Sequence, residues 1–271
     1  MSVSVLSLNF NGLRFMPKCI DSIRKQDYKN RIKMYIGDQG SEDGSREVLE
    51  KAPKDWFELV QFGTNIGHSV GYNRLIQYMM DKNDNPDYYF FVDFDTIFFP
   101  DAISTLVKHL ELDKTYAIAG LNAYSYNTKE LIKGYGGWII RGVYMHYWTD
   151  GGGSGSISNN YKPEWDASDY FQDEYEGGAC LMVKGSVLRE VWNKYGRWFD
   201  PIYAPLYEED LDICCEVRLM GYKVIHVTKS GFQHFVSPTA KTDPRTWWNI
   251  HLENKKKFIA KWSRLIDNGE L

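Results

Sequence analysis

The 271-residue sequence lacks the features of a secreted, membrane-spanning or zinc-stabilised protein. None of its four cysteines forms a Cys-x-x-Cys pair, so neither a disulfide framework nor a zinc site is indicated. No charged segment precedes an apolar run at the N-terminus, and no apolar stretch is long enough to span a bilayer. We therefore expect a cytoplasmic protein that is soluble or peripherally associated with a membrane.

The sequence also lacks an excess of positive charge. Its 32 Lys and Arg residues against 36 Asp and Glu residues give a net charge of −4, which argues against a protein that wraps duplex nucleic acid. Apolar and aromatic side chains are abundant, at 43% and 15% of the residues. A chain of this length can bury a sizeable core, and no linker or internal repeat divides it. We expect one domain over residues 1–271.

Apolar strand-like segments alternate with amphipathic helical segments in the first half of the chain. The expected strands are residues 2–8, 32–38, 56–62 and 87–95, and the expected helices are residues 14–26, 45–51 and 69–80. This alternation predicts a doubly wound sheet, in which ligands bind beyond the carboxyl ends of the strands. Four polar clusters follow those ends and should converge on one crevice: NFNG, GDQGSEDGS, TNIGHSVGYN and DFDT.

The second half of the chain has a different pattern. Two strand-like runs, residues 116–124 and 137–148, precede a Gly/Ser-rich loop at 150–160, which is expected to be either disordered or a mobile lid. Beyond it the pattern predicts two helices, a strand and a closing amphipathic helix, at residues 188–196, 208–222, 223–227 and 244–266. Gly221 is expected to cap the second of these helices.

Two carboxylates, Asp93 and Asp95, end the most apolar strand, in YYFFVDFDTIFFP. An ionised carboxylate is costly to bury unless it is paired or coordinated. Because alternate strand residues point the same way, both carboxylates are expected to face the crevice while Phe94 points elsewhere. Two hard oxygen ligands suit Mg²⁺ or Mn²⁺. The alternative is an acidic turn that leads into a helix starting at residues 96–100.

Over residues 2–235 the sequence resembles the family 2 glycosyltransferases of the GT-A fold. Six motifs carry the resemblance in the family's order: SVSVLSLNFNG with the helix after it, IGDQGSEDGS, NIGHSVGYN, VDFDT, YEGGACLMVKGSVL, and FDPIYAPLYEEDLDICCEVRLMGYKVIHV. Two positions depart from the usual pattern: Gln39 stands where Asn is usual, and Tyr72 where many members have Arg.

The resemblance implies an α/β fold with a Rossmann-like, mostly parallel central sheet flanked by helices, and a smaller acceptor-side subregion. Residues 1–100 would form the half that binds the nucleotide sugar and residues 101–243 the half that binds the acceptor. Residues 244–271 would form a C-terminal amphipathic helix.

The same resemblance implies roles for individual residues. The implied donor-binding residues are Leu8, Asn9, Asn11, Asp38, Asn65, Gly67, Asn73, Arg74 and Phe94, with Arg74 a phosphate contact. Asp93 and Asp95 would hold Mn²⁺ or Mg²⁺ on the diphosphate. His234 matches a histidine that completes this site in some relatives, and a structural role for it is an equal alternative. The implied acceptor-side residues are Gly177, Gly178 and Glu209.

Asp210 is the implied catalytic base. It lies in the run Glu208 to Asp210 at the start of a helix, where the helix dipole favours an ionised carboxylate. The alternative is that these acids only stabilise the helix terminus. The implied reaction transfers a sugar from a nucleotide diphosphosugar, with UDP expected, to an acceptor hydroxyl with inversion. The acceptor is expected to be a glycan, a lipid-linked glycan, a protein or a modified nucleobase.

Two other functions are compatible with parts of the sequence. A haloacid-dehalogenase-type phosphatase also uses an Asp-x-Asp-Thr motif, but on its first strand, whereas three strand–helix units precede Asp93 here. A non-catalytic nucleotide-sugar-binding protein is expected to lack one of the acids that this chain retains. The last helix is basic through Lys255, Lys256, Lys257, Lys261 and Arg264, which indicates either a solvated face or peripheral contact with an anionic membrane.

Overall fold

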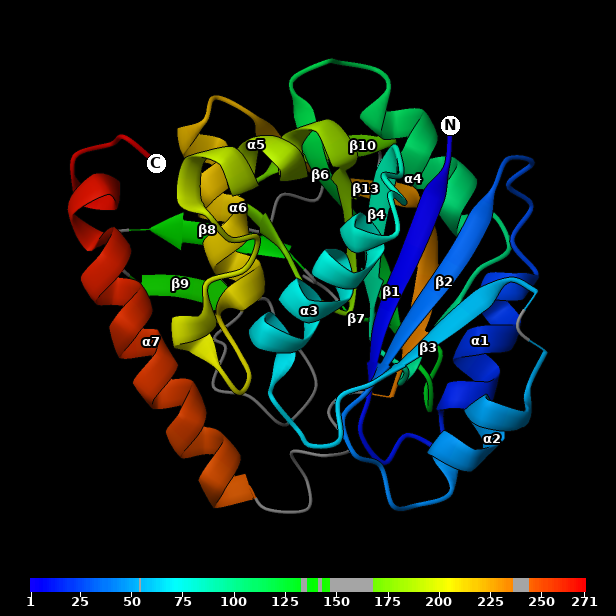
Figure 1. Cartoon of the computed structure of the whole chain (residues 1–271). Helices are drawn as coiled ribbons and strands as arrows, with labels where there is room; N and C mark the ends of the chain where they lie inside the picture. The colour runs from blue at the N-terminus through cyan, green and yellow to red at the C-terminus, as the bar shows by residue number, and fades with distance from the viewer. Residues whose placement is uncertain (54, 133–135, 141–142, 147–167, 236–243) are drawn as a thin grey trace.

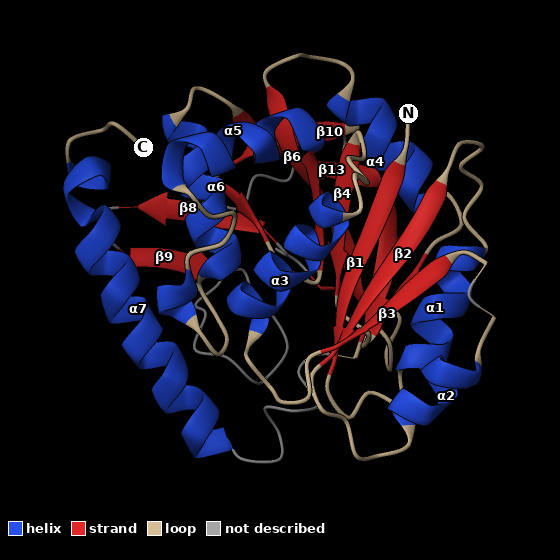
Figure 2. Cartoon of the chain, in the orientation of Figure 1, coloured by secondary structure: helices blue, strands red, loops and turns tan. Residues whose placement is uncertain are grey.

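A computed structural model describes residues 1–53, 55–132, 136–140, 143–146, 168–235 and 244–271. Ten strands form a central sheet with the path β10-β13-β6-β12-β4-β1-β2-β3, to which β5 and β7 pair through β13 and β6. Helices cover both faces of this sheet (Figures 1 and 2). A separate three-stranded sheet has the order β11-β8-β9. The predicted α/β fold with a mostly parallel sheet is confirmed.

The strands are β1 (Val3–Asn9), β2 (Ile32–Asp38), β3 (Phe57–Gln61), β4 (Tyr88–Val92), β5 (Thr96–Phe98), β6 (Tyr116–Ser125), β7 (Leu131–Ile132), β8 (Gly136–Ile140), β9 (Val143–His146), β10 (Tyr170–Asp173), β11 (Tyr175–Glu176), β12 (Cys180–Lys184) and β13 (Lys223–His234). The helices are α1 (Met16–Arg24), α2 (Ser45–Lys51), α3 (His68–Asp81), α4 (Ala102–Leu110), α5 (Gly185–Tyr195), the 3₁₀ turn η2 (Pro201–Tyr203), α6 (Glu209–Leu219) and α7 (Pro244–Asp267).

The first four strands and their helices lie where the sequence predicts them, and two later segments differ. The helix start considered at residues 96–100 is not observed. Residues 96–98 form β5, and α4 begins at Ala102. The strand predicted to end at residue 227 continues to His234, beyond an irregularity in its pairing with β6. That continuation brings His234 opposite Thr96 of β5.

Strand β4 is buried on both faces, as a central strand should be. Phe91 packs in the core beneath α3, α5 and α6, whereas Phe90 packs in the core beneath α1 and α4. Because the two rings anchor the strand from opposite sides, the turn that follows Val92 starts from a fixed position.

Helix α7 runs along the outer side of the molecule next to α6 (Figure 1) and is tied to it by a buried ionic network. Lys261 donates to Asp200 at 2.8 Å, to Asp212 at 2.9 Å and to Glu216 at 3.1 Å. Trp262 Nε1 donates to Asp212 at 2.7 Å. Three carboxylates thus share this one lysine, and burial together with the charge of Glu216 raises the pKa of Asp212 to about 6.

Asn254 of α7 holds the segment that leads into α6. Its Nδ2 donates to the backbone oxygens of Tyr203 and Leu206, at 2.6 and 2.8 Å, and its side chain is 1% exposed. Lys257 Nζ donates to the oxygen of Ile202 at 2.7 Å. Two of the five basic side chains that suggested a membrane-facing surface, Lys257 and Lys261, therefore bind protein atoms. Among the helices the structure describes, none is both long and apolar enough to cross a bilayer.

We expect Lys261→Met to destabilise the protein by about 3–5 kcal/mol, because it removes the cation that meets the buried Asp212 and leaves Asp200 and Glu216 with Arg197 alone. Chemical denaturation monitored by tryptophan fluorescence measures this. Lys256→Met is the matched control: Lys256 also forms an ion pair on α7, but its side chain is 71% exposed against 24% for Lys261, so its loss should cost less than about 1 kcal/mol. Equal effects of the two substitutions would contradict this account of α7.

Candidate active site

The ends of β1 and β2 are joined by buried polar side chains. Asn9 Nδ2 donates to Asp38 Oδ2 at 2.7 Å and to the hydroxyls of Ser41 and Ser45 at 2.9 Å. Asn9 Oδ1 has no hydrogen-bond partner among the described residues. A Cβ at Gly12 would lie 2.5 Å from this oxygen, so glycine there leaves room beside it. Two predicted donor-binding side chains thus lie together at the carboxyl edge.

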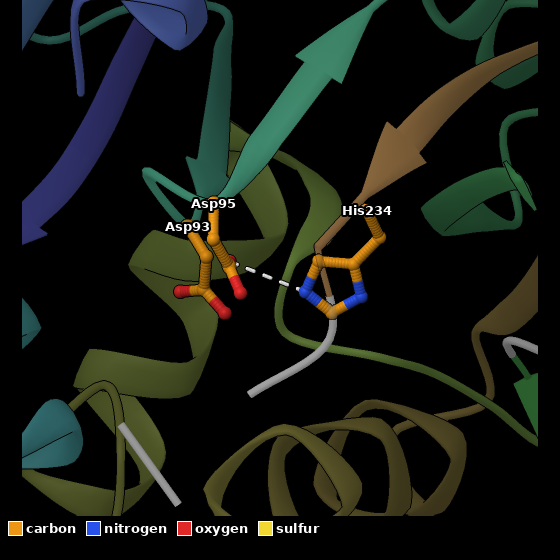
Figure 3. A group of neighbouring side chains, drawn as sticks. All are labelled: Asp93, Asp95 and His234. Carbon is orange, nitrogen blue, oxygen red and sulfur yellow. Dashed lines mark hydrogen bonds and ion pairs between the residues drawn. The ribbon is translucent and has the colours of Figure 1, made fainter. Parts of the chain in front are cut away.

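Asp93, Asp95 and His234 form the second polar group at this edge (Figure 3). Strand β4 ends at Val92, so the two carboxylates lie in the turn to β5 and not on the strand itself. One ligand atom from each residue lies within 4.8 Å of the others, and His234 Nε2 is 3.2 Å from Asp95 Oδ1. The convergence expected from strand alternation is therefore produced by the turn.

These three side chains have the electrostatics of a cation site. Burial and the charge of Asp95 raise the pKa of Asp93, against the opposing effect of the His68 side chain. Burial also opposes the ionisation of Asp95, but His234 outweighs it and lowers the pKa of Asp95. Two carboxylate oxygens and an imidazole that already converge are a suitable ligand set for Mn²⁺ or Mg²⁺.

Asp210 is the second residue of α6 and is held by backbone N–H groups. Its Oδ2 accepts from Gly178 N at 2.8 Å, and its Oδ1 from Leu211 N at 2.8 Å. Burial and the charge of Glu209 raise the pKa of Asp210 to about 7. This differs from the expectation that the helix dipole keeps the carboxylate ionised, because burial and the neighbouring charge outweigh the dipole. A carboxyl group with a pKa near neutrality suits proton transfer.

His68, the first residue of α3, is a site residue that the sequence-based prediction omits. Its Nδ1 is 3.3 Å from Glu209 Oε1. Burial disfavours the cation, but the contact with Glu209 and the charges of Asp93 and Asp210 outweigh it and raise the pKa of His68 to about 9. The sequence could have indicated this role, because His68 directly follows the Asn-x-Gly motif at residues 65–67 and is the first residue of α3. His68 links the group around Asp93 with the acids of α6.

The turn before His68 packs tightly against the segment that leads into α6. Asn65 Oδ1 accepts from Gly67 N at 3.0 Å. Gly67 has φ +81°, and a Cβ there would lie 2.6 Å from the backbone of Pro205. His68 N donates to Pro205 O at 2.8 Å. Glycine at position 67 therefore lets the turn at residues 65–67 pack directly against the backbone at Pro205.

The remaining predicted donor residues take varied positions. Asn73 exchanges two 2.8 Å hydrogen bonds with the backbone of Phe199, so its amide has a structural role. Arg74 lies over the ring of Phe62 at 4.8 Å from its centroid. Phe94 is buried in the core beneath α1, which limits any contact with a donor to its backbone.

Leu8 and Asn11, at and just beyond the end of β1, are the last two predicted donor-binding residues. Leu8 is partly buried, with side-chain atoms close to Gly71, and Asn11 Oδ1 accepts from Glu42 N at 2.9 Å. The Gly/Ser-rich loop at 150–160 lies outside the described residues.

A buried group behind Gly177 and Gly178 was also missed by sequence analysis. His226 Nε2 is 3.0 Å from Asn122 Oδ1, and His226 Nδ1 is 2.9 Å from Glu176 Oε1. Burial raises the pKa of Glu176 well above its usual range and lowers the pKa of His226, so burial favours the neutral form of both side chains. Both ring nitrogens of His226 are thus engaged by neighbouring side chains, one of which, Glu176, directly precedes the Gly177–Gly178 turn.

Comparison with known proteins identifies the family. The sequence model of glycosyl transferase family 2 matches residues 4–192. The chain belongs to this family. It is 27% identical over 237 residues to Glycosyltransferase GlyA of Streptococcus pneumoniae serotype 4, covering 86% of this chain and 30% of that protein. It is 30% identical over 153 residues to an N-acetylglucosaminyltransferase of Mesorhizobium japonicum, covering 54% of this chain and 33% of that protein. The chain thus spans about a third of the length of these curated relatives.

Solved structures of glycosyltransferases share the fold. GalNAc-T7 with UDP, GalNAc and Mn²⁺ gives a TM-score of 0.65 at 16% identity, over 86% of this chain and 44% of that one. S. aureus TarS 1–349 in complex with UDP gives 0.59 at 14% identity, over 88% and 61%. The predicted family and GT-A fold are confirmed, and the family match removes the reason for the phosphatase alternative.

We expect Asp210→Asn to lower kcat by about 10²–10⁴-fold while donor affinity changes little, because the substitution keeps the shape and removes the proton acceptor. Initial rates of nucleotide release and calorimetric titration with the donor measure the two effects. Since three acids are adjacent, Glu208→Gln is the control, and Glu209→Gln is compared at saturating donor. Near-full turnover by Asp210→Asn with an inactive Glu209→Gln would move the base to Glu209.

The raised pKa of Asp210 predicts a pH dependence. The carboxyl group is protonated below about pH 7 and cannot accept a proton, so kcat should rise with pH through about 7 and then level off. Because the charge of Glu209 contributes to the shift, Glu209→Gln should move the midpoint to lower pH. A kcat that is constant between pH 5.5 and 8.5 would contradict this assignment.

Proposed function

We propose that this protein transfers a sugar from a nucleotide diphosphosugar to an acceptor hydroxyl with inversion, assisted by a divalent cation. The observation that carries the proposal is the link through His68. The His68 side chain contacts Glu209, which directly precedes the proposed base Asp210. The charge of Asp93 helps to raise the pKa of His68. This link supports placing the proposed cation site and the proposed base next to each other at the carboxyl edge of the sheet.

In this proposal, separate groups of residues bind the nucleotide and the cation. Asn9 and Asp38, with Leu8 and Asn11, contact the base and ribose of the nucleotide. Asp93, Asp95 and His234 would hold Mn²⁺ or Mg²⁺, which would supply positive charge beside the leaving diphosphate.

Ionised Asp210 takes the proton of the acceptor hydroxyl while that oxygen attacks the anomeric carbon from the face opposite the diphosphate. A single base with direct attack inverts the configuration of that carbon. The Gly177–Gly178 turn fixes the orientation of Asp210 through the hydrogen bond from Gly178 N.

UDP is the nucleotide we favour. TarS and GalNAc-T7 were solved with UDP, while the mannosyltransferase PcManGT of Pyrobaculum calidifontis, with a TM-score of 0.57, was solved with GDP-Man and Mn²⁺. The acceptor classes remain a glycan, a lipid-linked glycan, a protein or a modified nucleobase. A screen of nucleotide release with sugar donors and these acceptor classes, in the presence of Mn²⁺, tests the proposal.

We expect nucleoside diphosphate binding to depend on the cation, because the acids at the crevice repel a diphosphate unless a cation neutralises them. Isothermal titration with UDP, with Mn²⁺ or with EDTA, measures the dependence. Asp95→Ala should weaken binding as EDTA does. Asp21→Ala, which removes an exposed carboxylate of α1, is the control and should bind as the wild type. Equal affinity for UDP with and without the cation would contradict the proposal.

A further inference from the structure

Glu209 has a buried carboxylate oxygen that lacks a partner. The residue is 6% exposed, and its Oε1 lies 3.3 Å from His68 Nδ1. Its Oε2 makes no hydrogen bond within the described part of the chain. Leaving a buried carboxylate oxygen unpaired costs free energy, so such an atom at a functional edge indicates that a ligand completes it.

The side chain that holds Glu209 is itself fixed. The backbone N–H of His68 is bonded to Pro205 O, and its ring lies edge-on to the ring of Tyr72, with 5.9 Å between centroids. Tyr72 is 3% exposed, and its hydroxyl also has no hydrogen-bond partner among the described residues. His68 is therefore held from two sides, by its backbone bond to Pro205 and by the contact of its ring with Tyr72.

The acidic side chains near Glu209 Oε2 indicate which kind of ligand group can bind to it. Glu209, Asp210 and Asp93 all act on His68, and this concentration of acids disfavours a phosphate group beside Glu209 Oε2. The atom needs a hydrogen-bond donor, and a neutral hydroxyl supplies one without adding negative charge. A sugar ring offers several such hydroxyls.

The position of the pair distinguishes the two sugars of the reaction. His68 begins α3, and Glu209 directly precedes Asp210. The charges of Asp93 and Asp210 both act on His68, so the pair adjoins the proposed cation group as well as the proposed base. In the proposed reaction the donor sugar must lie there, with its anomeric carbon between the diphosphate and the base.

We propose that His68 positions Glu209 so that its Oε2 accepts a hydrogen bond from a hydroxyl of the donor sugar, which makes the pair a determinant of donor specificity. This inference rests on the proposed function and assigns Glu209 to the donor sugar, whereas the family resemblance implies the acceptor side. A charged hydrogen bond of this kind accounts for about 10- to 100-fold in affinity.

The test separates recognition of the sugar from recognition of the nucleotide. Calorimetry with Mn²⁺ compares UDP and GDP with their glucose, galactose, mannose, N-acetylglucosamine and N-acetylgalactosamine conjugates. Glu209→Gln should weaken binding of the preferred sugar nucleotide by about 10- to 100-fold and leave its parent nucleotide within about twofold. It should also reduce the discrimination between epimers that differ at one hydroxyl.

Substitutions of His68 test its positioning role. His68→Phe keeps the ring without the donor and should reproduce the effect of Glu209→Gln. His68→Asn places an amide N–H near the position of Nδ1 and should recover part of the affinity. His251→Asn is the matched control, because His251 Nδ1 lies 3.2 Å from Glu208 Oε1 in a similar pair one residue away. That control should leave the difference between sugar nucleotide and nucleotide unchanged.

The outcomes distinguish this inference from the proposed function. A wild type that binds no nucleoside diphosphate or sugar nucleotide overturns both. Normal sugar-nucleotide binding by Glu209→Gln with a raised KM for the acceptor places Glu209 on the acceptor and overturns the inference alone. An equal loss of affinity for nucleotide and sugar nucleotide also overturns it. Circular dichroism checks folding, and Glu209→Gln, which keeps the size of the side chain, decides the matter if His68→Phe does not fold.

Discussion

The concentration of carboxylates at the carboxyl edge of the sheet is the constraint on which the rest of the site depends. Asp93, Asp95, Glu209 and Asp210 lie where the ends of β4 and β13 and the start of α6 meet. Such a group is tolerated only when cations or hydrogen-bond donors meet it. His234 lowers the pKa of Asp95, whereas burial raises the pKa values of Asp93 and Asp210. This difference supports the proposed divalent cation at Asp93 and Asp95 and the proposed proton transfer at Asp210.

The rest of the fold holds these charges in place. Phe90 and Phe91 clamp β4 from opposite faces, so the turn with Asp93 starts from a rigid strand. Helix α7 holds α6 and the segment before it through the network of Lys261 and the amide of Asn254. One of the basic residues that suggested membrane contact, Lys261, thus has a structural role. Gly67 and His68 pack against Pro205, which brings the turn before α3 against the segment that leads into α6.

Local patterns in the sequence predict the first four strands and their helices, because apolar periodicity decides those elements directly. They place Asp93 and Asp95 on the fourth strand, whereas the strand ends at Val92 and both acids lie in the turn after it. The long-range pairings are not predictable in this way. The antiparallel pairing of β13 with β5, which brings His234 to Asp95, depends on a register that no local pattern contains. The contact of His68 with Glu209 joins residues 141 positions apart and depends on how the segment around Pro205 packs. The family resemblance supplies Asp210, but its raised pKa follows from burial, which only the structure reveals.

The central claim is that the negative crevice holds a divalent cation between Asp93, Asp95 and His234 when a nucleotide is bound. Anomalous diffraction from crystals grown with UDP and Mn²⁺, recorded at the manganese absorption edge, tests this claim most directly. The account predicts one strong anomalous peak coordinated by the carboxylates of Asp93 and Asp95, next to the diphosphate. A nucleotide bound at this edge with no manganese peak, or a peak only beside Glu176 and His226, would contradict it.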